Sequence, residues 1–92
     1  METMEFTLSD GTTVTFRKLK MKDLMAVDGV SNKTLKAMKL IAAAITAVNG
    51  TEKSLTYKDI ADWDVGDFQK ASDALSEFSG IDLSERDIKK EF

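Results

Sequence analysis

Residues 4–19 read MEFTLSDGTTVTFRKL, and this stretch decides the fold of the N-terminal part of the chain. Apolar and polar residues alternate on both sides of Asp10-Gly11. Alternation with a period of two around an Asp-Gly pair predicts an antiparallel β-hairpin with one apolar face. The apolar positions of this hairpin are Met4, Phe6, Leu8, Val14 and Phe16.

The spacing of the apolar residues also selects the turn. A two-residue loop would place Phe6 opposite Thr15 and turn Val14 toward water, because a register slip of one residue reverses the face of every side chain. A three-residue loop instead pairs Phe6 with Val14. We therefore expect a type I turn followed by a bulge in which Gly11 is left-handed.

Helical periodicity dominates the rest of the chain. An isolated two-stranded hairpin is marginal in water, so helices must cover its apolar face. The longest expected helix has the broadest apolar face and ends at Asn49-Gly50. The expected helices span residues 22–28, 32–48, 57–63 and 65–79, with a fifth over 84–91 if the C-terminal segment is also helical.

The expected fold class is therefore α+β. An N-terminal antiparallel β-hairpin, about residues 3–18, packs against four or five α-helices. The length of 92 residues is that of one small domain, residues 1–92.

The segment DIADWDVGDF, residues 59–68, places four aspartates around the only tryptophan. A calcium-binding EF-hand loop aligned at Asp62 fails, because its glycine comes one residue early and its twelfth position holds Asp73 instead of glutamate. Helix capping is the favoured interpretation, and alanine at Asp64 would then cost about 1 kcal/mol. A small polar residue is followed three positions later by aspartate in Thr56–Asp59, Asp64–Asp67 and Ser84–Asp87.

The composition argues against catalysis. The chain has neither histidine nor cysteine, which removes the commonest general base, the commonest transition-metal ligand and the thiol nucleophile. It contains no phosphate-binding loop, nucleophile elbow or dinucleotide-binding glycine fingerprint. We expect a protein that is not an enzyme, with no catalytic, cofactor-binding or metal-binding residues.

Charge is distributed unevenly along the chain. The net charge is −3, but residues 1–50 carry +2 and residues 51–92 carry −5. This asymmetry leaves head-to-tail self-association as a homo-oligomer open. The basic run from Arg17 to Lys22 allows a small nucleic-acid-binding regulator, but no cluster of aromatic residues accompanies it for base stacking. Its favoured interpretation is a solvated strand end, and we expect no nucleic-acid partner.

Two segments give the chain a family resemblance. One is the R-x-L-x-x-x-D-L step at Arg17, Leu19, Asp23 and Leu24, which follows a hairpin with Asp-Gly at its tip. The other is LTYKDIADWDVGDF, from Leu55. Together with the alanine-rich helix between them, they make residues 4–80 similar to the tail assembly chaperones of tailed bacteriophages and prophages.

The resemblance implies a role during tail assembly. Such chaperones are thought to coat the tape-measure protein, keep it soluble and help to recruit the tail-tube protein. They are absent from the finished virion. The resemblance thus implies a non-enzymatic chaperone in the cytoplasm of a bacterial host. The alternative is a structural minor tail or connector component that stays in the virion.

A protein that keeps an elongated helical partner soluble needs an apolar surface with a charged rim. We expect part of the longest helix, or the C-terminal part of the chain, to be more exposed than a monomer requires. For Leu40 and Ile41, completion of a small core is an explanation at least as good as partner binding. The candidate partner-binding residues are Leu40, Ile41, Ala44, Phe78, Ile88 and Phe92. No apolar run approaches the roughly 18 residues of a membrane span, so we expect no membrane partner.

Overall fold

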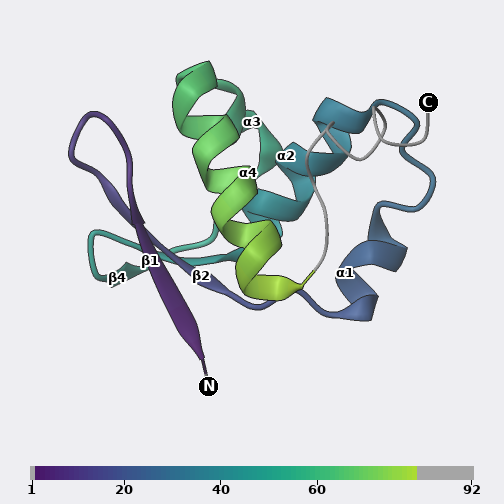
Figure 1. Cartoon of the computed structure of the whole chain (residues 1–92), viewed down its shortest axis with the longest axis horizontal. Helices are drawn as coiled ribbons and strands as arrows, with labels where there is room; N and C mark the ends of the chain where they lie inside the picture. The colour runs from purple at the N-terminus through teal and green to yellow at the C-terminus, as the bar shows by residue number, and fades with distance from the viewer. Residues whose placement is uncertain (1, 81–92) are drawn as a thin grey trace.

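A computed structural model describes residues 2–80 of the chain. These residues form a small α+β domain in which the helices gather on one side of an antiparallel sheet (Figure 1). The elements in chain order are β1 (Thr3–Thr7), β2 (Thr13–Arg17), α1 (Met21–Ala26), α2 (Lys33–Ala44), β3 (Ile45–Val48), β4 (Thr51–Glu52), α3 (Tyr57–Ala61) and α4 (Val65–Ser79).

The predicted register of the first hairpin is confirmed. Phe6 lies opposite Val14, and Met4 lies opposite Phe16. The N–H of Leu8 donates to the carbonyl of Thr12 at 2.7 Å, which closes a three-residue loop. Gly11 has a φ of 93°, the left-handed value expected of the bulge residue.

The prediction of one helix over residues 32–48 is wrong at its C-terminal end. Helix α2 stops at Ala44, and the next four residues form β3, which pairs with β2. Val48 and Thr51 then pair across Asn49-Gly50, whose φ values of 52° and 79° are those of a two-residue type I′ turn. The sheet therefore has four strands, in the order β1-β2-β3-β4, instead of the two expected.

Four of the remaining helix boundaries also differ from the predicted ones, and the first is the start of α2, which lies at Lys33 instead of residue 32. Helix α1 begins at Met21 and ends at Ala26, whereas the predicted range was 22–28. Helix α3 ends two residues early, at Ala61. Helix α4 coincides with the predicted range, and Gly80 caps it with a φ of 75°. The expected helix over 84–91 lies outside the described residues.

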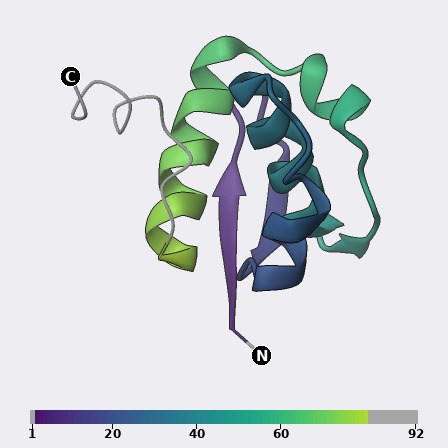
Figure 2. The ribbon, with the colours of Figure 1, turned by 90° about the vertical axis from the view of Figure 1, so that its right-hand side faces the viewer.

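The core lies between the sheet and the two longest helices. Val14 and Phe16 of β2 are buried beneath Leu40 and Ile41 of α2, and Leu75 of α4 completes the cluster. Trp63, between α3 and α4, is half-buried and packs against this core. Both views place the last turn of α4 and helix α1 at the end of the molecule where β1 begins (Figures 1 and 2).

Candidate functional site

The aspartates of residues 59–68 have structural partners of two kinds. Asp59, in the first turn of α3, accepts a hydrogen bond from the N–H of Thr56 at 2.8 Å. This bond stabilises the helix start from the third position of a capping box. The third predicted cap, Ser84–Asp87, lies outside the described residues.

The prediction that the Asp64 side chain caps α4 is wrong. Asp64 occupies the N-cap position, but its carboxylate accepts no hydrogen bond from the helix N–H groups. It lies instead 3.4 Å from the hydroxyl of Ser9 in the hairpin turn. Asp67 accepts from the same serine twice, from the N–H at 3.0 Å and from the hydroxyl at 2.8 Å. These carboxylates therefore attach the hairpin turn to the start of α4.

Within residues 2–80, no three aspartate, glutamate, histidine or cysteine side chains come together in a way that could hold a metal ion. Asp59 is engaged with Thr56, whereas Asp64 and Asp67 are engaged with Ser9. The Asp59 contact is therefore local, whereas Asp64 and Asp67 share a partner in the hairpin turn.

The basic run beginning at Arg17 is partly neutralised within the fold. The Arg17 guanidinium makes two hydrogen bonds to the Asp23 carboxylate, at 2.9 and 3.0 Å, and Asp23 also accepts the N–H of Lys20 at 2.8 Å. The Arg17 hydrogen bonds, followed by the contact with Lys20, hold the pKa of Asp23 below its ordinary value. The hydrogen bonds that Arg17 donates to Asp23 in turn raise the pKa of Arg17.

This ion pair gives the R-x-L-x-x-x-D-L segment a structural meaning. Arg17 and Asp23 fix the turn from β2 into α1, while Leu19 is buried and Leu24 packs against the core. Arg17 is therefore committed to a side chain of its own fold, and phosphate contact would require it to leave Asp23.

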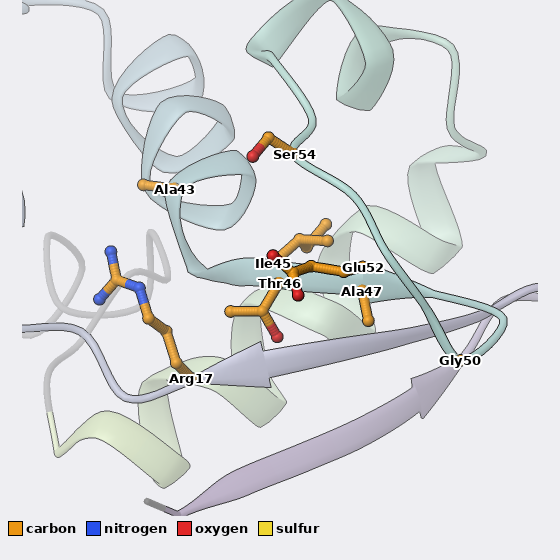
Figure 3. A pocket seen from close by; sticks show the side chains of 8 residues that line it. All are labelled: Arg17, Ala43, Ile45, Thr46, Ala47, Gly50, Glu52 and Ser54. Atoms are coloured by element: carbon orange, nitrogen blue, oxygen red, sulfur yellow. The ribbon is translucent and has the colours of Figure 1, made fainter.

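A shallow cleft of about 530 Å³ lies beside β3 and β4 (Figure 3). Arg17 stands at one end and Gly50 at the other. Its two ionisable side chains are Arg17, which is paired with Asp23, and the exposed Glu52. This lining pairs no nucleophile with a base. The lining residues are Arg17, Ala43, Ile45, Thr46, Ala47, Gly50, Glu52 and Ser54.

The predicted partner-binding residues fall into three groups. Leu40, Ile41 and Ala44 are 1%, 0% and 0% exposed, so the surplus exposure expected of them is not observed. Phe78 is half-buried, and the ammonium of Lys18 lies 5.6 Å from the centre of its ring. The predicted residues Ile88 and Phe92 lie outside the described part of the chain.

The most exposed of the large apolar side chains in the described residues were missed by sequence reasoning. Met21 and Met25, one turn apart on α1, are 69% and 73% exposed, and Val65 at the start of α4 is 72% exposed. We call Met21 and Met25 the methionine patch. A sequence signal existed for Met25, which directly follows the inward-facing Leu24 and so lies about 100° around the helix from it. The exposure of Met21 had no such signal, because Met21 is three residues before Leu24 and so lies on nearly the same side of the helix.

Lysines flank the methionine patch. Lys20 and Lys22 are exposed beside it, whereas Asp23, the acidic residue of α1, is buried and paired with Arg17. The outer face of α1 therefore carries two exposed methionines beside two exposed lysines, and the exposed Asp28 lies in the turn that follows the helix. That combination suits contact with a protein segment, because methionine adapts its shape to a partner and lysines attract acidic side chains.

The fold and this surface together describe a small α+β protein whose accessible features suit protein contact. A family model, "Phage tail assembly chaperone proteins, E, or 41 or 14", matches residues 4–80, and the chain belongs to this family. The match runs from β1 to the C-terminal cap of α4. No curated protein and no solved structure matched the chain. None of the helices in the described residues is long and apolar enough to cross a membrane.

Proposed function

We propose that this protein is a non-enzymatic chaperone that binds the tape-measure and tail-tube proteins during tail morphogenesis in the cytoplasm of a bacterial host. The observation that carries the proposal is the family match, which covers almost every element of the fold. The role needs a surface for a protein partner and requires no reaction.

The methionine patch is the surface that we assign to the partner. An apolar helix face with a charged rim is what an amphipathic helix of an elongated partner would contact. Phe78 remains a candidate for partner contact, because its ring is only half-buried and lies beneath the ammonium of Lys18. Lys18 precedes Met21 by three residues. Leu40, Ile41 and Ala44 do not remain candidates, because their burial places them in the core.

Co-expression with the proteins encoded beside this chain, followed by capture of the chain under native conditions, tests the proposal. We expect a long tape-measure protein to be captured with the wild-type chain and to be lost when Met21 and Met25 are both serine. Recovery of the chain alone would contradict the proposal. Mass spectrometry of purified particles separates it from the alternative of a structural tail component, because a chaperone is absent from the virion.

A further inference from the structure

The turn from α3 into α4 is a second exposed surface, and its charge is negative. Val65, the first residue of α4, is 72% exposed. Residues 59–67 contain four aspartates and no basic residue. The nearest basic residues along the chain, Lys58 and Lys70, lie four residues before Asp62 and five residues after Val65. We call this surface the α3–α4 corner and define it by its exposed residues, which are Ala61, Asp62, Asp64 and Val65.

The methionine patch has the opposite charge. Lys20 and Lys22 are exposed beside it, and no ion pair within residues 2–80 engages them. The acidic residues of the same stretch offset little of this charge, because Asp23 is paired with Arg17 and the exposed Asp28 lies three residues beyond the patch. The two aspartates of the corner also form no ion pair within residues 2–80. The patch and the corner are therefore complementary in polarity and in charge.

The two surfaces cannot meet within one molecule, because α4 holds them apart. Val65 begins this helix, whereas Ser79, its last residue, accepts a hydrogen bond from the N–H of Leu19 at 3.0 Å. Leu19 precedes Met21 by two residues. Because α4 has 15 residues, its length of about 22 Å separates the corner from the patch. In Figure 1, the start of α4 lies at the top of the molecule and α1 at its lower right.

We propose that copies of this chain associate head to tail, with the methionine patch of one copy against the α3–α4 corner of the next. Val65 of one copy then covers Met21 and Met25 of its neighbour, and the lysines beside the patch face the aspartates of the corner. The contact is heterologous, so a pair of copies keeps one free patch and one free corner, to which further copies can add. One short helix against a corner covers less than the roughly 1,200 Å² of a standard interface, so the association is weak and reversible.

This contact goes beyond the proposed function and needs no protein other than this chain. A second copy and a tape-measure segment exclude one another at the methionine patch, so self-association belongs to the chain without its partner. A substitution in the corner abolishes self-association and leaves the patch available to the partner. The two proposals can therefore fail independently.

Sedimentation velocity of the full-length chain at increasing concentration tests the contact. The average sedimentation coefficient should rise between about 10 µM and about 1 mM, a range that suits a weak interface. Salt at about 1 M should suppress this rise, because it shortens the Debye length to about 3 Å. Val65→Lys should weaken the association by about ten-fold or more, because it places a cation against the lysines of the neighbour. Thr51→Lys is the matched control, because it adds the same charge at an exposed position of β4 and should change nothing.

A mixture of two variants tests the head-to-tail arrangement. Val65→Lys keeps an intact patch, and the chain with serine at Met21 and Met25 keeps an intact corner. Each variant alone should stay monomeric where the wild type associates, with a melting temperature close to that of the wild type. An equal mixture should form dimers and stop there, because the remaining patch and corner are both altered. The proposal is overturned by a sedimentation coefficient that does not change with concentration, by association that survives Val65→Lys or high salt, or by a mixture that stays monomeric.

Discussion

Asp67 and Ser9, which are 58 positions apart in the sequence, are joined by two hydrogen bonds. The Ser9 N–H and hydroxyl both donate to the same carboxylate, at 3.0 and 2.8 Å. This contact attaches the tip of the first hairpin to the first turn of α4. The carboxylate also lies where the exposed N–H groups of a helix start favour negative charge.

We expect Asp67→Ala to lower the free energy of unfolding by about 1 kcal/mol, because it removes both hydrogen bonds to Ser9. Asp64→Ala should cost less than half of that, because Asp64 makes one long contact and no helix cap. Urea denaturation of the two variants measures the difference. Equal losses, or a larger loss at Asp64, would restore the capping interpretation.

The Arg17–Asp23 pair predicts a specific dependence of stability on pH. The pKa of Asp23 is lowered in the folded state, so its contribution is present above the unfolded value, about 3.9, and is lost as pH falls through the folded value. We expect Asp23→Asn to cost about 2 kcal/mol at pH 7. The difference from the wild type should shrink below about pH 4.

Denaturation at several pH values checks this prediction. Asp10 is the matched control, because the hydrogen bond from the N–H of Thr12 lowers the pKa of Asp10 while its side chain remains exposed. Asp10→Asn should give a smaller difference over the same pH range. A loss at Asp23 that stays constant from pH 7 to pH 3 would show that the ionised pair does not stabilise the turn.

The turn at Asn49-Gly50 gives a third prediction. Gly50 has a φ of 79° with no atom close to where a Cβ would be, so Gly50→Ala should cost about 1 kcal/mol through backbone strain alone. Gly66 is equally open but lies in the first turn of α4 without a positive φ. Gly66→Ala should therefore stabilise the protein by about 0.5 kcal/mol. Thermal denaturation that gave both substitutions the same sign would contradict the assignment of the turn.

The methionine patch gives a prediction about binding. Serine at both Met21 and Met25 should weaken capture of the tape-measure partner at least ten-fold, because it removes the apolar contact. The melting temperature should stay nearly unchanged, since both side chains are already exposed. Val65→Ser is the matched control, because Val65 is equally exposed but lies at the start of α4, away from α1. Equal loss of binding in both variants would show that the patch has no special role.

The sequence predicted the features that depend on local pattern. The alternation of apolar and polar residues in the hairpin predicted that Phe6 pairs with Val14. The apolar stripe of residues 65–79, followed by Gly80, predicted the range of α4. The prediction of a helix at residues 45–48 failed because the sequence there fits two structures. Ile45 and Val48, three apart, continue the apolar stripe of α2, but both residues also suit a strand. Pairing with β2, more than 28 positions away, decided between the two, and Asn49-Gly50 was the overlooked hairpin signal.

The candidate site was less predictable for the same reason. Whether Leu40 and Ile41 face a partner or a core depends on which elements pack around α2, and in the fold β2, β3, α3 and α4 all contact this helix. The engagement of Asp67 with Ser9 is equally invisible locally, because its partner lies in another element. The outward position of Met25 could have been derived from the inward position of Leu24, whereas that of Met21, three residues before Leu24, could not.

The most direct test of the chaperone account is the soluble fraction of the tape-measure protein, expressed with and without this chain in the same host. The account predicts that most of the tape-measure protein is insoluble alone and becomes soluble and bound when the wild-type chain is present. It also predicts that the chain with serine at Met21 and Met25, although folded, fails to provide this effect. A tape-measure protein whose solubility is the same in the presence and absence of the chain would contradict the account.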